Sequence, residues 1–431
     1  MSSLTRKLES VLQSRGPHGL MRIPPPSYSG SDGTNATLDF SLNDYLSLSE
    51  STELRGLFLD RIQTAPSLFG SGSSRVIVNP KPLADLEQRL ARFFDAPDVL
   101  IFGSGHDANV AFFRHVPQPG DIVLYDQYIH ASIHDGMRSG RAQLVSFEHN
   151  DSVDLRQKLK GIVEGDAGVG EGTTSVFLAV ESIYSMDGSI APLKLFVDAL
   201  DEELPKGNGH FIVDEAHATG VYGPQGRGIV AAYGLESRCL ARLHTFGKSL
   251  ASTGAVLLTT PLIREYLASH ARVFIFTTAP SHSTVISIDC AFDMLESSVG
   301  TEGATHLLDL CAYLTQLLLL KLADVPPHIL SLLPHFHRPL SPDVHTLPET
   351  TLPTPIIPLI TPRAAELSAF LATRGIRTPY VIFPVVPRDK ARVRVCVNAN
   401  KTREDIEMLA DAVGDWAREM VKGDSNIGTK L

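Results

Sequence analysis

The sequence predicts an α/β fold: a large domain with a mainly parallel sheet, followed by a smaller C-terminal α+β domain. Between about residues 51 and 280, short apolar runs rich in β-branched residues alternate with segments of helical length. This alternation is typical of a parallel sheet that is covered by helices on both faces. After residue 285 the pattern changes to a long helical stretch, a proline-rich connection and a strand-like run at 392–397. The length of 431 residues also suits two or three packed units.

The expected elements follow in chain order. Residues 1–50 form an N-terminal arm, in which Leu4, Leu8, Val11 and Leu12 recur at helical spacing. Residues 51–285 form the large domain, whose expected strands are Val99–Phe102, Asp121–Leu124, Ser175–Val180 and Phe211–Val213. Residues 286–431 form the C-terminal domain, and a Thr-x-x-Asp sequence at Thr402 predicts the start of its last helix.

Composition excludes several classes of function. The formal net charge of -10 is spread along the chain, so we expect no nucleic-acid surface, which would need clustered Lys and Arg. The four cysteines lie far apart and form no CxxC pair, so we expect neither a disulfide framework nor a metal site. No apolar run reaches the roughly 18 residues of a membrane span, and the leucines at 317–320 lie in a short amphipathic stretch that we expect to be core helix.

Two charged residues carry the strongest chemical signal. Asp214 ends the apolar run Phe211–Val213, and in open α/β sheets ligands bind beyond the carboxyl ends of the strands. Lys248 lies 34 residues later in Thr245-Phe246-Gly247-Lys248, where a lysine of low exposure can form an imine. Taken alone, Asp214 fits a turn cap and Lys248 a solvated surface residue. Together they suit a pyridoxal ring, because an acid can keep its pyridinium nitrogen protonated.

Two further segments fit the same chemistry. Gly103-Ser104-Gly105 separates a predicted strand from a helix, and small residues there can form a phosphate cradle at the helix N-terminus. His130, in His130-Ala131-Ser132, could stack on a planar ring, although a histidine near a helix start is more often a capped surface residue. A tight turn is likewise the ordinary role of Gly-Ser-Gly.

These segments, in this order, resemble the α-oxoamine synthases, the acyl-CoA:amino acid C-acyltransferases among the fold-type I pyridoxal-phosphate enzymes. The resemblance implies a sheet of the seven-stranded type and pyridoxal 5'-phosphate as the cofactor. It runs almost end to end and includes 40–46, 70–75, the Gly105 turn, 130–132, 149–151, 185–188, 214–228 and 245–248.

The resemblance also implies residue roles. Lys248 would carry the cofactor as an imine, Asp214 would pair with the pyridine nitrogen and His130 would stack on the ring; with His217 these form the catalytic set. Further cofactor contacts are implied for Gly105, His106, Ser185, His217, Thr245, Thr277 and Thr278. Substrate contacts are implied for Arg22, Asn43, Val385 and Arg394, of which Arg394 would grip the amino-acid carboxylate through its planar fork.

Within the family, Asp214–Gly223 and Gly254–Leu257 look like the branch that forms 8-amino-7-oxononanoate for biotin. That branch implies decarboxylative condensation of L-alanine with pimeloyl-CoA. Departures at Ser73, Leu83, His106 and Val385 keep two alternatives open: a glycine- or serine-using relative, and an enzyme that releases a secondary-metabolite acyl chain. An inactive partner subunit is the alternative from another class, but such subunits typically lack the lysine.

The family resemblance implies a homodimer with active sites at the subunit interface. The loop Gly70–Arg75 and the pair Thr277-Thr278 would then lie where a neighbour's phosphate is touched. The chain ends in Thr429-Lys430-Leu431, which resembles the peroxisomal address Ser-Lys-Leu. We therefore expect either a peroxisomal or a cytoplasmic enzyme, with no membrane partner.

Overall fold

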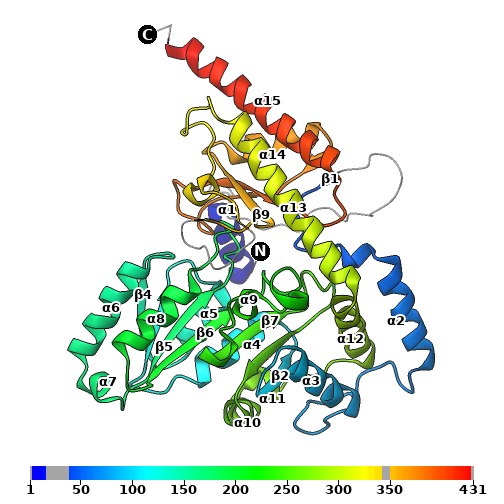
Figure 1. Ribbon diagram of the computed structural model, residues 1–431, viewed down its shortest axis with the longest axis vertical. Coiled ribbons are helices and arrows are strands. Elements are labelled where there is room, and N and C mark those ends of the chain that lie inside the picture. Colours follow the sequence, from blue (N-terminus) through cyan, green and yellow to red (C-terminus); the bar gives the residue numbers. More distant parts are fainter. Residues whose placement is uncertain (1, 16–37, 342–349, 429–431) are drawn as a thin grey trace.

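A seven-stranded sheet forms the centre of the large domain in the computed structural model, which describes residues 2–15, 38–341 and 350–428 (Figure 1). Five of its strands carry parallel pairings, and β8 runs antiparallel to both of its neighbours. The prediction of a mainly parallel sheet is confirmed. In spatial order the strands are β2 (Asp98–Phe102), β8 (Ala255–Thr259), β7 (Cys239–Thr245), β6 (Gly209–Asp214), β5 (Val176–Glu181), β3 (Ile122–Asp126) and β4 (Gln143–Phe147).

Helices cover both faces of this sheet, and β5 shows the division. Its six residues are all buried. Val176 and Leu178 pack in the core with α6 and α8, whereas Phe177 and Ala179 pack on the other face with α4 and α5. The helices of this domain are α2 (Thr52–Thr64), α3 (Lys81–Phe93), α4 (Gly105–His115), α5 (Ala131–Ser139), α6 (Ser152–Gly165), α7 (Ala167–Glu171), α8 (Leu193–Glu203), α9 (Ile229–Tyr233), α10 (Pro261–His270), α11 (Arg272–Ile275) and α12 (His282–Glu296).

The smaller domain lies above the large one in Figure 1, and the long helix α13 extends from the large domain into the smaller one. A three-stranded antiparallel sheet forms its centre, and the predicted start of the last helix is confirmed by reciprocal hydrogen bonds between Thr402 and Asp405. The predicted boundary at residue 285 lies within α12, which packs against α2 and α3. The elements are α13 (Ser298–Lys321), β9 (Ile356–Ile360), α14 (Ala364–Thr373), β10 (Ile376–Arg377), β11 (Tyr380–Val381), β12 (Arg392–Cys396) and α15 (Arg403–Gly428).

The long helical stretch expected after residue 285 is present as α12 and α13, and the leucines at 317–320 end α13, which has 24 residues. Within the described chain, α13 is the one helix that is long and apolar enough to cross a membrane, by length and composition alone. Its buried side, which includes Leu310 and Leu314, packs in the core of the domain and α13 contacts α15.

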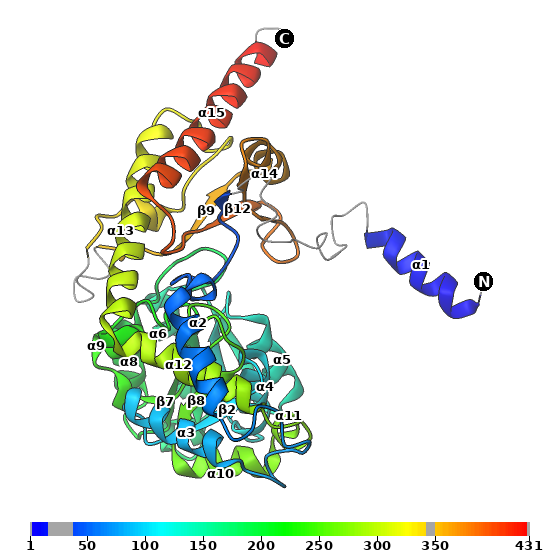
Figure 2. The same ribbon diagram turned by 90° about the vertical axis from the view of Figure 1, so that its right-hand side faces the viewer.

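The segment from residue 38 onward packs with strands from the C-terminal part of the chain. Strand β1 (Leu38–Asp39) pairs in parallel with β10, and the Cys396 backbone N–H donates to the Phe40 carbonyl. Residues 38–45 therefore complete the smaller domain. Helix α1 (Ser3–Arg15) has no buried residue and lies apart from both domains (Figure 2).

Candidate active site

The carboxyl ends of β5, β6 and β7 bring three functional segments together. Glu181 is in register with Asp214, and Asp214 with Leu243, so both carboxyl groups lie at the same edge of the sheet. Thr245 ends β7, and the following turn, closed by the Ser252 N–H on the Phe246 carbonyl, carries Lys248 toward that edge. The sheet thus places the two predicted charged residues side by side.

Lys248 and its neighbours form an electrostatically linked group. Burial lowers the pKa of the Lys248 ammonium to about 8, although the charges of Asp214 and Glu181 oppose the shift. Burial raises the pKa of Glu181 well above its usual range, and one of its carboxyl oxygens, Oε1, has no hydrogen-bond partner among the described residues. A lysine with this pKa is partly neutral near physiological pH, which imine formation requires.

Hydrogen bonds connect Asp214 to His130 through two residues that the sequence did not single out. The Asn109 side-chain amide donates to Asp214 Oδ2 (2.8 Å) and to the Ser132 hydroxyl (3.0 Å). The Ser132 hydroxyl lies 2.7 Å from His130 Nδ1. His130 does cap α5 and is exposed, as the ordinary interpretation of its position predicts, and partial desolvation lowers the pKa of its imidazole. The cap and the ring-stacking role are therefore compatible.

The predicted phosphate cradle lies at the N-terminus of α4. Ser104 caps this helix by accepting from the Asp107 N–H. A Cβ at Gly105 would lie 3.7 Å from Thr245 Oγ1, so the glycine leaves room between the helix start and that hydroxyl. The side chain of His106 is exposed and its Nε2 lies 3.3 Å from Asp135 Oδ2.

The remaining predicted site residues lie on the side of the active site that faces the smaller domain. Both terminal nitrogens of Arg394 donate to Asn43 Oδ1 (3.1 Å each), and its Nε donates to the Ser185 carbonyl. His217 is buried, its pKa is lowered well below the usual range by that burial, and its Nδ1 shares a hydrogen bond of 2.7 Å with the Tyr45 hydroxyl. Tyr45 lies in the family-like segment 40–46 but was assigned no role, because its partner is 172 residues away.

An adjacent cavity of about 540 Å³ is lined by His130, Ser185, Arg392 and Val385 among others. Val385 is 45% exposed. Thr277 and Thr278 lie on an exposed stretch, where Thr278 pairs with Ser74. Within the Gly70–Arg75 loop, Arg75 instead turns inward to an ion pair with Glu87 (2.7 Å). Arg22 and Thr429–Leu431 lie outside the described residues.

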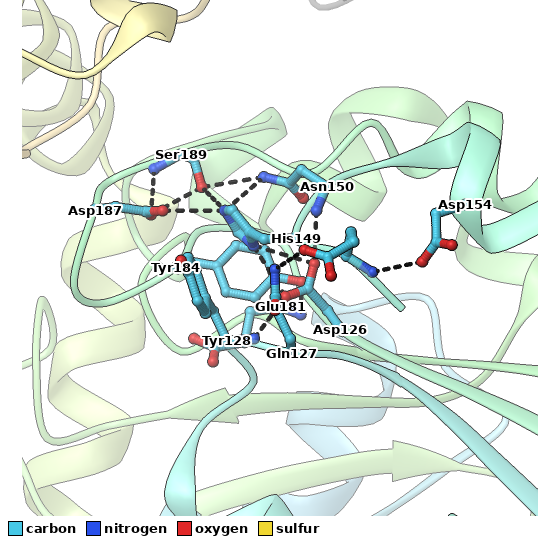
Figure 3. A network of polar contacts seen from close by, with 11 residues as sticks. Asp126, Gln127, Tyr128, His149, Asn150, Asp154, Glu181, Tyr184, Asp187 and Ser189 are labelled. Carbon is cyan, nitrogen blue, oxygen red and sulfur yellow. Dashed lines mark hydrogen bonds and ion pairs between the residues drawn. The ribbon is translucent and has the colours of Figure 1, made fainter. Parts of the chain in front are cut away.

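A second polar cluster surrounds His149, as Figure 3 shows. The two ring nitrogens lie 2.9 Å from Asp126 Oδ1 and 3.0 Å from Asp187 Oδ2, and Ser189 Oγ also donates to Asp187. The ring stacks on Tyr128 with centroids 4.5 Å apart. The sequence pointed to His149 and Asp187 only through the family resemblance and assigned them no role.

The residues fit pyridoxal phosphate. A lysine of lowered pKa, a carboxylate fixed by Asn109 and by the Ala216 N–H, and a glycine-started helix beside a hydroxyl are the groups that bind its aldehyde, its pyridine nitrogen and its phosphate. Together with the sheet they define a fold-type I pyridoxal-phosphate enzyme.

Comparison with known proteins agrees. The model of the family "Aminotransferase class I and II" matches residues 36–413, and the chain belongs to this family. It is 40% identical over 392 residues to 8-amino-7-oxononanoate synthase of Emericella nidulans, covering 90% of this chain and 91% of that one. It is 35% identical over 398 residues to aminoacyl transferase sphA of Aspergillus fumigatus, covering 90% and 82%.

A solved serine palmitoyltransferase structure with pyridoxal phosphate superposes with a TM-score of 0.79 at 22% identity, covering 97% of this chain and 99% of that one. This likeness confirms the predicted fold. The predicted resemblance to α-oxoamine synthases is confirmed as well: the chain is a pyridoxal-phosphate-dependent acyltransferase of that kind.

Proposed function

We propose that this enzyme condenses L-alanine with pimeloyl-CoA and releases 8-amino-7-oxononanoate, CoA and carbon dioxide. The observation that supports this most is the 40% identity to an 8-amino-7-oxononanoate synthase over 90% of the chain. In the reaction a carbon–carbon bond forms between the amino-acid α-carbon and the acyl carbonyl carbon as the CoA thiolate leaves. The bond to the α-carboxyl carbon then breaks, and carbon dioxide departs.

The residues divide this work. Pyridoxal phosphate, when bound, supplies an electron sink for the α-carbon. Lys248 would hold it through Nζ, and once the amino acid has displaced that nitrogen the free amine removes the α-proton and later returns one, which suits an amine with a pKa of about 8. Asp214 keeps the pyridine nitrogen protonated, and His130 packs on the ring. Arg394 binds the substrate carboxylate.

Other predicted residues have supporting parts in the proposal. The phosphate is bound by Thr245 and by the start of α4 at Gly105 and His106. The ring oxygen of the cofactor and the amino acid are contacted by Ser185 and the neutral His217. Asn43 orients Arg394, which agrees with its hydrogen bonds to both terminal nitrogens. Arg22 and Val385 contact the bound substrates.

The second candidate is a relative with another amino acid or acyl chain, which the 35% identity to aminoacyl transferase sphA favours. The test measures carbon dioxide release from L-alanine, glycine and L-serine, each with pimeloyl-CoA and with palmitoyl-CoA. The proposal expects L-alanine with pimeloyl-CoA to give the highest kcat/KM. A higher value for glycine or serine, or for the palmitoyl thioester, would replace it with the second candidate.

We also propose a homodimer, in which Thr277 and Thr278 reach the phosphate of the neighbouring subunit. Light scattering during gel filtration would test it, and an active monomer at micromolar concentration would contradict it. For location we propose the peroxisome, with the cytoplasm as the alternative. A fluorescent protein fused to the N-terminus, with and without Thr429–Leu431, gives the answer, since diffuse signal from both fusions rejects the peroxisome.

A further inference from the structure

The turn between β5 and α8 is a contact point of the two domains. Arg392 Nη1 donates to the Met186 carbonyl (2.9 Å), and Arg394 Nε donates to the Ser185 carbonyl. Both arginines lie on β12, two residues apart, so they share one face of the small sheet. The turn therefore presents two carbonyl groups that orient two guanidinium groups.

The same turn is tied to the large domain through His149. Its Nε2 lies 3.0 Å from Asp187 Oδ2, and its Nδ1 lies 2.9 Å from Asp126 Oδ1 at the end of β3 (Figure 3). Gly188 completes the turn at a φ of 68°, where a Cβ would overlap the Ile356 carbonyl of β9. The turn thus has little freedom to move away from either domain.

His149 acts as a charged cross-link. Burial opposes its charge, but the hydrogen bonds to Asp126 and Asp187 outweigh burial and raise its pKa to about 10. The imidazolium donates through both nitrogens and faces two carboxylates, with His335 and Arg392 as the next charged or titratable groups around Asp187. Without the imidazolium, the buried carboxylates of Asp126 and Asp187 would lose the cation that both contact, and Asp187 would keep only its bonds from Ser189 and the nearby charge of Arg392.

We propose that His149 is a positioning residue for the substrate-carboxylate subsite: it fixes the Ser185–Asp187 turn, which in turn orients Arg394. This rests on the proposed role of Arg394 in binding the amino-acid carboxylate. In this proposal His149 affects only the contact between Arg394 and the substrate carboxylate. Its loss should therefore weaken the binding of amino acids and leave the binding of analogues without a carboxylate charge unchanged.

The test compares wild type with His149→Asn, both loaded with pyridoxal phosphate. The first ligand is the amino acid that the wild type turns over, chosen among L-alanine, glycine and L-serine, and the second is the carboxamide of that amino acid. The change in cofactor absorbance on titration gives the dissociation constant of each ligand. We expect the variant to bind the amino acid about tenfold more weakly and the carboxamide with less than about a twofold change. His210→Asn, which removes a half-buried histidine bonded to Ser175 at the opposite end of β6, is the matched control.

A second variant guards against misfolding. Asp187→Asn removes one side of the cross-link and should show the same selectivity with a smaller effect. Combining His149→Asn with Arg394→Lys should cost less than the product of the single effects, because both act on one contact. Equal weakening of both ligands, no weakening, or multiplicative effects would each overturn the positioning role. Failure of the proposed substrates appears separately, as absent turnover in wild type.

Discussion

The floor of the active site and its carboxylate side are built in different ways. Asp214 ends β6 and Lys248 follows β7, its neighbour in the same sheet, so a single folded domain places both residues. On the carboxylate side, Arg394 meets Asn43 of its own domain across 351 residues and Ser185 of the large domain across 209, and the second contact forms only when the two domains dock. From this difference we expect substitutions of the floor residues to slow the chemical step, whereas substitutions on the carboxylate side should weaken the binding of the amino acid.

Lys248→Ala should produce the largest effect, a loss of turnover of more than about 10³-fold, because no other amine can replace its Nζ. Initial rates of product formation measure this, with circular dichroism to confirm folding. Lys81→Ala, on the exposed surface of α3, should keep the wild-type rate. Product formation near the wild-type rate by a folded Lys248→Ala protein is incompatible with the assignment.

Asp214→Asn should reduce kcat by roughly 10²- to 10⁴-fold, since an amide does not keep the pyridine nitrogen protonated. The cofactor should still bind, because its phosphate contacts remain. Single-turnover kinetics on cofactor-saturated protein would isolate the chemical step. An unchanged rate would reduce Asp214 to the turn cap that its bond to the Ala216 N–H also allows.

Arg394→Lys should show the opposite division, raising KM for the amino acid by about 10- to 100-fold with a smaller change in kcat, because a lysine loses the planar fork. Steady-state kinetics with the amino acid varied would separate the two constants. A drop in kcat alone would erase the contrast between the two sides of the site.

The smallest expected effect is that of pH on cofactor uptake. The neutral Lys248 amine is the nucleophile, and its pKa of about 8 makes the neutral fraction fall about tenfold for each pH unit below 8. Uptake of pyridoxal phosphate by the cofactor-free protein, followed by absorbance, should therefore accelerate up to about pH 8 and level off above it. An uptake rate still rising tenfold per unit at pH 10 would show a lysine with an unshifted pKa.

The local sequence pattern predicted much of the floor of the active site, because each apolar strand run and the functional residue that ends it are adjacent in the sequence. The contacts that refine it had no such signal: Asn109 reaches Asp214 across 105 residues, and Tyr45 reaches His217 through domain docking. Arg75 shows the same limit, since its loop was expected to face a neighbour while the side chain pairs inward with Glu87.

The pairing of β1 with β10 has a consequence for biosynthesis. The partners of residues 38–40 are Ile376, Arg377 and Cys396, which leave the ribosome long after residues 38–40 do. The large sheet can assemble as it emerges, since domains usually fold in order of synthesis. Residues 38–45, by contrast, must wait with Phe40 and Tyr45 unburied until residues 376–396 have been synthesised. A ribosome stalled before residue 376 would therefore hold a nascent chain whose first segment is open to chaperones and proteases.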